Sequence, residues 1–283
     1  MKYHPYHLVD QRPWPIILAC GFLTIVLGFL SLFNFRSVKL LLLGLSLSVG
    51  CALRWVNDVN DESNLGFHTD VVRKGFIVRF IIFIMREILL FAGFFWSFFT
   101  NSLVPVLEIG VMWPPKSLLN PSPLGASTAG TALLLTSGAY LTWAHHALLA
   151  KNYNYVIGGF IYCFILGELF VVIQASEYSM RPFSVSDSVL GCCFFLLTGL
   201  HGLHVIVGLS LLWLCFIRFI RADMTRTKHV GFETAAWYWH FVDIVWLFVF
   251  RLIYAWRSHE ELSIVDYLSS GTNYMISKFM CYN

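Results

Sequence analysis

The stretch IIFIMREILLFAGFFW, residues 81–96, decides the fold, because it reads as a membrane-spanning segment with two charges at its centre. About 20 apolar residues cross a bilayer as a helix, and this stretch continues an apolar run on both sides. An ionisable side chain near the bilayer centre costs at least ~2.5 kcal/mol unless it pairs or reaches the interface. We therefore expect a spanning helix in which Arg86 and Glu87 need polar partners.

The whole chain has the composition of a membrane protein. Of its 283 residues, 58% are hydrophobic and only 12% are charged, and its mean hydropathy is +0.70. A soluble domain usually carries about twice that charged fraction. The net charge of +3 is small, and no run of lysine or arginine indicates a nucleic-acid partner. We predict an all-α, multi-pass membrane protein.

Seven apolar stretches are long enough to cross a bilayer as helices. They cover residues 14–34, 38–56, 71–103, 125–149, 153–178, 187–220 and 230–257. Lysine and arginine favour the side of the N-terminus, so we expect the N-terminus in the positive-inside compartment and the C-terminus opposite. The connection at 104–124 is rich in proline and glycine, and we expect an ordered loop there.

Polar side chains inside the spans could carry chemistry. They are His145 and His146, Glu168, Gln174 and Glu177, His201 and His204, and Glu233, His240 and Asp243. A di-metal carboxylate site would repeat a Glu-x-x-His motif, and this motif occurs in no span. We therefore expect no metal and no catalytic residue, and we expect the histidines to form interhelical hydrogen bonds.

Two other functions stay open on the residues alone. An independent multi-pass transporter would need helices broken near the midplane, and proline is nearly absent from the span interiors. A redox carrier in its own right would need paired histidines at matched depth on separate helices. Neither pattern is evident in the sequence.

Six motifs together closely resemble subunit III of the cytochrome c oxidases of mitochondria and related bacteria. They are HPYHLVDQRPWPI (4–16), FAGFFWSFF (91–99), TWAHHALL (142–149), QASEY (174–178), TGLHGLHVIVG (198–208) and AWYWHFVDIVWLFVF (236–250). Each motif alone is weak, but all six occur in the family's order between about residues 4 and 257.

The resemblance implies a seven-helix subunit in which two helices are separated from five by a cleft that holds phospholipids. Residues 1–60 would form the first part and residues 61–257 the five-helix bundle. Residues 258–283 extend past the family's usual end, and they lack an apolar run long enough for an eighth crossing. We expect this tail on the outer side, against an accessory subunit.

The resemblance also implies a place and partners. The chain would lie in the mitochondrial inner membrane, with its N-terminus in the matrix and its C-terminus in the intermembrane space. It would bind no haem or copper itself and would pack against catalytic subunit I, which holds both, and against further core and accessory subunits. Bound phospholipids are expected, and nucleic acid is not.

Individual residues take expected roles from the resemblance. Glu87 matches the family's intramembrane carboxylate, which is implicated in sustaining proton uptake by the neighbouring subunit. Glu62, His68 and Arg218 match positions that contact lipid headgroups.

Arg86 and Glu168 depart from the family's usual residues. Neighbours in a helix point roughly 100° apart, so we expect Arg86 and Glu87 to be poorly placed to neutralise each other. Arg86 and Glu168 stand at similar depth in spans three and five, and we predict an interhelical pair between them.

Overall fold

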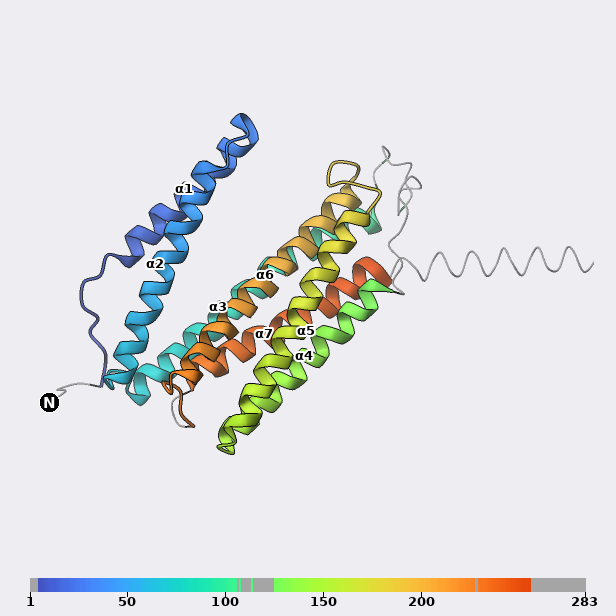
Figure 1. Cartoon of the computed structure of the whole chain (residues 1–283). Helices are drawn as coiled ribbons and strands as arrows, with labels where there is room; N and C mark the ends of the chain where they lie inside the picture. The colour runs from blue at the N-terminus through green and yellow to red at the C-terminus, as the bar shows by residue number, and fades with distance from the viewer. Residues whose placement is uncertain (1–4, 106, 108–112, 114–124, 227–228, 256–283) are drawn as a thin grey trace, which may run out of the picture. The chain divides into compact units, whose positions relative to one another are not determined.

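The computed structural model describes residues 5–105, 107, 113, 125–226 and 229–255, and this part of the chain contains seven α-helices (Figure 1). They are α1 (Trp14–Phe35), α2 (Lys39–Asn64), α3 (Asp70–Leu103), α4 (Ala126–Leu149), α5 (Tyr153–Met180), α6 (Val189–Ile220) and α7 (Val230–Val249). A π-helical turn, η2 (Phe250–Ala255), continues α7. Most of the predicted loop at 104–124 and the whole tail at 258–283 lie outside the described residues.

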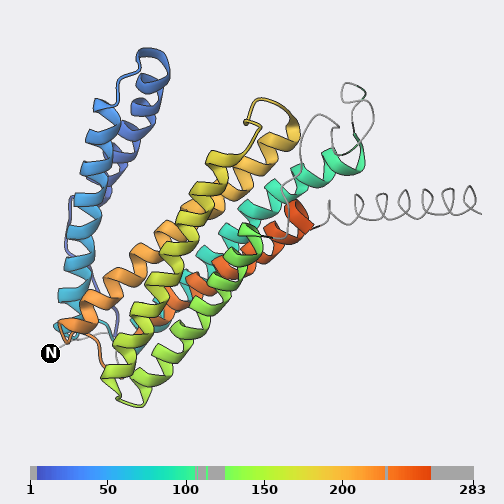
Figure 2. The same ribbon diagram turned by 45° about the vertical axis from the view of Figure 1, so that its right-hand side comes forward.

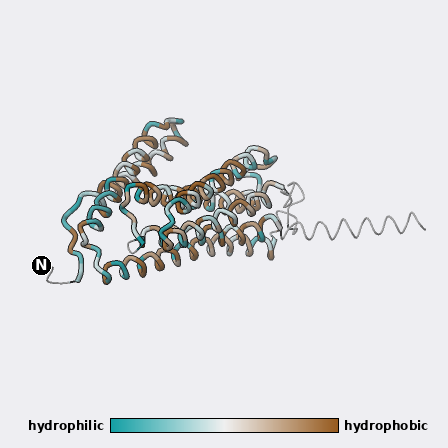
Figure 3. Tube along the Cα trace, turned by 60° about the horizontal axis from the view of Figure 1, so that its bottom comes forward, coloured by the Kyte–Doolittle hydropathy of each residue, from teal (hydrophilic) through white to brown (hydrophobic). Residues whose placement is uncertain are grey.

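The seven helices match the seven predicted spans one to one. Within the described residues, five helices are long and apolar enough to cross a membrane: α1, α2, α5, α6, and α7 extended to Tyr254. Hydrophobic residues run along most of the helices, as Figure 3 shows in brown. The prediction of an all-helical, multi-pass membrane protein is confirmed. The main difference is α2, which continues to Asn64, past the predicted end at residue 56.

Local sequence sets several helix ends. Pro15 lies in the first turn of α1, where its missing N–H costs nothing. Arg36 ends α1 in the left-handed conformation (φ 53°), which closes the short turn to α2. The Ser188 hydroxyl accepts a hydrogen bond from the Gly191 N–H at 3.1 Å and caps α6. At the end of α5, Pro182 follows Arg181 and stops the helix.

The chain divides into two compact units, the first ending at Arg79 and the second beginning at Phe80. In the first unit α1 and α2 pack on each other as an antiparallel hairpin. Gly28 of α1 makes this approach close, because a Cβ added to it would lie 2.5 Å from Cα of Leu41 on α2. Small residues at such positions let membrane helices come together.

The second unit is a bundle in which successive helices from α4 to α7 run antiparallel (Figures 1 and 2). α4 packs closely on α5, and α7 contacts α4 and α6. Trp239 of α7 is fully buried, and its ring fills the space beside Gly167 of α5 and Gly208 of α6. α7 is therefore the central helix of this unit.

Large side chains join α3 to the bundle. Phe83 stacks on Tyr238 with ring centroids 6.1 Å apart, and Phe91 meets Phe241 edge-on at 6.3 Å. Aromatic pairs of this kind add about 0.5–1.5 kcal/mol beyond the burial of their surface. The predicted division at residues 60 and 61, and the lipid-filled cleft between two and five helices, stay predictions.

We predict that Gly28→Ala destabilises the α1–α2 hairpin by about 1–3 kcal/mol, because the added methyl meets backbone atoms of Leu41 that cannot rotate away. Gly50→Ala in α2 is the matched control, since a Cβ there meets nothing within 4 Å. Thermal unfolding in mild detergent measures both variants. An equal effect of the two substitutions would show that the close approach at Gly28 contributes nothing.

Candidate functional site

Glu87 is buried in the second unit and has polar partners on two sides. Its side chain lies on the inward face of α3, one turn before Phe91. Its Oε2 is 3.1 Å from Nε2 of His204 on α6, and Arg86 Nη2 donates to its Oε1 at 2.8 Å. The charged stretch of α3 therefore meets its need for partners inside the protein.

The contacts of His204 show that one proton is shared with Glu87. Nδ1 of His204 lies 2.8 Å from the carbonyl oxygen of Leu200, which can only accept, so Nδ1 carries a hydrogen. Nε2 and a fully ionised carboxylate could not bond if both were acceptors. A proton must therefore lie on Nε2 or on Oε2 of Glu87, and either arrangement satisfies both groups.

Aromatic rings enclose this shared proton. The Phe91 ring centroid is 5.0 Å from that of His204, and the Tyr238 ring stacks on His204 at 6.2 Å. Both rings are almost fully buried. In such surroundings a bond between an acid and a base is stronger than in water. The pair can hold or pass a single proton.

The expectation that Arg86 and Glu87 are poorly placed to neutralise each other is wrong. The long arginine side chain folds back over the ring of Phe83, with its Cζ 5.0 Å from the ring centroid, and reaches Glu87. Three methylene groups give it this reach although the two Cβ atoms diverge. The Arg86 side chain remains 71% exposed.

The structure does not bring Arg86 and Glu168 together. Gly167 faces the buried ring of Trp239, so its neighbour Glu168 points away from the bundle and is exposed. Similar depth along two helices was the basis of the predicted pair, and depth does not fix the face on which a side chain lies. Within the described residues, the cation at Arg86 pairs with Glu87 instead.

Glu62 lies among one arginine and two histidine side chains of the first unit. It is 8% exposed, near the end of α2, and is paired with Arg12. Nε2 of His7 lies 3.3 Å from Oε2 of Glu62, and Nε2 of His68 lies 3.8 Å from the same oxygen. Two of the predicted lipid contacts, Glu62 and His68, are thus neighbours, and Arg12 and His7 are members that the sequence did not single out.

Arg218, the third predicted lipid contact, lies in the second unit near the end of α6. Its guanidinium lies against Gly231 of α7, where an added Cβ would come within 2.8 Å of Nη1. Its Nε is buried and has no hydrogen-bond partner in the described part of the chain. Arg218 is therefore held between two helices rather than extended freely from the surface.

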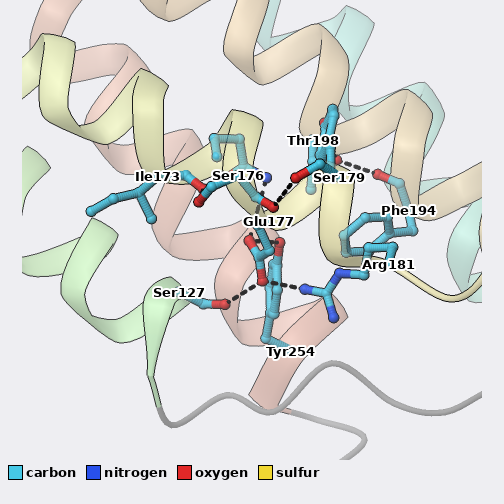
Figure 4. Close-up of polar contacts among 11 residues, drawn as sticks. Ser127, Ile173, Ser176, Glu177, Ser179, Arg181, Phe194, Thr198 and Tyr254 are labelled. Carbon is cyan, nitrogen blue, oxygen red and sulfur yellow. Dashed lines mark hydrogen bonds and ion pairs between the residues drawn. The ribbon is translucent and has the colours of Figure 1, made fainter.

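Glu177 lies at the centre of a polar network near the end of α5 (Figure 4). Ser127 of α4 donates to its Oε1 at 3.0 Å, and Tyr254 of η2 donates to its Oε2 at 3.2 Å. Arg181 pairs with the same carboxylate, and its Cζ lies 5.0 Å from the ring centroid of Phe194. One carboxylate thus joins α4, α5 and η2.

The histidines within α6 and α7 make interhelical hydrogen bonds, as predicted. Nε2 of His201 lies 3.2 Å from the carbonyl oxygen of Val242, and Nε2 of His240 lies 3.3 Å from Oγ1 of Thr142. Such bonds add specificity and modest stability between membrane helices.

One further group was not found from the sequence: His145, His229 and Glu233 lie together where α4 ends and α7 begins. The sequence pointed to His145 and Glu233 in separate clusters and passed over His229. The spacing of His229 and Glu233, four residues apart at the start of a helix, is the local signal that could have found the pair.

Comparison with known proteins gives a consistent result. Residues 4–258 match the family model described as cytochrome c oxidase subunit III. The chain is 44% identical over 256 residues to cytochrome c oxidase subunit 3 of Damaliscus lunatus and 45% identical to that of Nanger granti. Each alignment covers 90% of this chain and 98% of the relative.

We predict that Glu177→Ala lowers the free energy of unfolding by about 3–5 kcal/mol, because it leaves the guanidinium of Arg181 buried without its counter-charge. Ser176→Ala, next to it on the exposed face, removes only a bond to the carbonyl of Ile173 one turn earlier and should change stability by less than about 0.5 kcal/mol. Thermal unfolding of the two variants in the same detergent decides the matter. If Glu177→Ala were as stable as Ser176→Ala, the network in Figure 4 would contribute little to the free energy of unfolding.

Proposed function

The chain belongs to the cytochrome c oxidase subunit III family, and from this membership we propose that it is a non-catalytic core subunit of cytochrome c oxidase, respiratory complex IV. The complex reduces oxygen to water and pumps protons. The helices support a multi-pass position in the mitochondrial inner membrane. We place the N-terminus in the matrix and the C-terminus in the intermembrane space, on the basis of the lysine and arginine bias.

We propose that catalytic subunit I, which holds haem and copper, is the main partner, together with further core and accessory subunits. His201, His204 and His240 each form a hydrogen bond to another helix of this chain. This use of the histidines supports a structural role for the subunit. Many large apolar side chains, such as Phe29 and Phe33, are exposed and available to lipid or to neighbouring subunits.

Phospholipid binding is part of this proposal. Arg12, His7 and His68 surround Glu62, so the carboxylate orients three side chains that can donate to phosphate oxygens. Glu62 would act by holding these donors rather than by touching an anionic headgroup. Arg218 supplies a further cation in the second unit.

Glu87 is proposed to support proton uptake by the neighbouring subunit. The observation that carries this role is the bond between Glu87 and His204, which requires one shared proton between the two groups, beside the ring of Phe91. The shared proton can move between Glu87 and His204, and the carboxylate keeps the Arg86 guanidinium as its partner when the proton is on His204.

The first test of this function is purification. We expect the tagged chain, extracted in mild detergent, to co-purify with haem-containing subunits and to migrate with cytochrome c oxidase activity on a native gel. A chain that runs alone as a monomer or homo-oligomer, with no haem-containing partner, would favour an independent transporter.

The second test concerns Glu87. Glu87→Gln keeps the shape and a donor for His204 but removes the ionisable group, so we expect normal assembly and a lower rate of proton uptake during sustained turnover. Glu168→Gln is the matched control, because that carboxylate is exposed on α5, and it should leave proton uptake unchanged. Loss of assembly in Glu87→Gln would show that Glu87 is needed for packing instead.

A further inference from the structure

The cluster of His145, His229 and Glu233 has the composition of a zinc site. His145 lies in the last turns of α4, His229 precedes the first residue of α7, and Glu233 lies in the first turn of α7. One ligand atom from each residue lies within 4.8 Å of the other two. Two imidazoles and one carboxylate form a ligand set that Zn²⁺ uses in proteins.

The two histidines have nitrogen atoms available for a metal. Nε2 of His145 and Nδ1 of His229 are both buried, and neither has a hydrogen-bond partner in the described part of the chain. A buried polar atom without a partner usually costs about 1–3 kcal/mol, so such atoms call for an explanation. Two of them side by side, with ring centroids 5.4 Å apart, are explained by a common ligand.

Glu233 supplies the third ligand and lies on the exposed side of the cluster. Nε2 of His229 is already 3.0 Å from Oε1 of Glu233, and the Glu233 side chain is 30% exposed while that of His229 is 11% exposed. Zinc bonds of about 2.0–2.2 Å in a tetrahedron place ligand atoms roughly 3.3 Å apart. The three ligand atoms, which lie within 4.8 Å of one another, must therefore approach each other to hold an ion that enters past Glu233.

We propose that His145, His229 and Glu233 bind one Zn²⁺ ion, which fixes the start of α7 to the end of α4. Hard cations such as Mg²⁺ and Ca²⁺ prefer oxygen ligands and would be poorly served by two imidazoles. Three protein ligands leave a fourth position for water. This site lies at a different place from Glu87. It departs from the expectation of no metal, which rested on the lack of paired histidines at matched depth on separate helices and of repeated Glu-x-x-His motifs.

The test measures Zn²⁺ bound to the purified membrane complex that contains this chain. The complex is stripped with chelator, dialysed against a range of free Zn²⁺ concentrations, and its metal content is measured by mass spectrometry. We expect His145→Gln and Glu233→Gln each to bind one fewer Zn²⁺ per chain at concentrations that fill the wild-type site. Loss of a direct ligand should weaken that site at least about 100-fold.

His146→Gln is the matched control, because His146 is adjacent to His145 and is not one of the three ligands. It should bind as much Zn²⁺ as the wild type. Equal Zn²⁺ binding by the wild type and all three variants would overturn the proposal. An equal loss of Zn²⁺ in His146→Gln and His145→Gln would overturn it too.

A second measurement needs no variant. Diethyl pyrocarbonate modifies free imidazoles, and peptide mass spectrometry locates the modified residues. We expect Zn²⁺ to protect His145 and His229 and to leave His146 unprotected. Modification of all three histidines to the same extent with and without Zn²⁺ would contradict the site even if the ligand variants fail to assemble.

Discussion

A polar atom that is buried inside a membrane bundle must find its partner within the protein, because lipid offers none. The central helix α7 meets this constraint on several sides. Nε1 of Trp239 donates to Ser137 at 3.0 Å, and Nε1 of Trp246 donates to Thr131 at 2.9 Å, so two large rings are anchored to α4. His201 of α6 bonds to the Val242 carbonyl. The aromatic packing of the second unit is arranged around these fixed points.

Two carboxylates of the second unit, Glu177 and Glu87, illustrate two uses of the same group. Glu177 receives hydrogen bonds from a serine, a tyrosine and an arginine, so its oxygens are saturated and its position is fixed. Glu87 instead shares a proton with His204, and its other partner, Arg86, is largely exposed. The first arrangement holds helices together, whereas in the second the shared proton can move between Glu87 and His204 without loss of the bond.

The sequence was sufficient for the helices and for the family. Apolar runs fix where a membrane helix lies, and six motifs in order are specific. It began α6 two residues too early, at 187 instead of Val189. It ended α2 too early, because the polar residues of VNDVNDESN continue the helix beyond the apolar run. Side-chain partners were harder to predict. The contact of Arg86 with Glu87 depends on how a flexible side chain folds, and the His145 cluster joins residues that are distant in sequence.

The length of α2 has a consequence for the response to ionic strength. Its 26 residues extend about 39 Å at 1.5 Å per residue, whereas a hydrocarbon core is about 30 Å thick. The polar last turns, which carry Glu62, therefore reach the zone of water and headgroups, where dissolved ions screen charges over about 8 Å at physiological salt. Salt would weaken the attraction between Glu62 and Arg12, although less than that of an exposed pair, because the two side chains are only 10% and 20% exposed. It has no comparable access to Glu87 and His204, so Glu62 and Glu87 respond to different features of their surroundings.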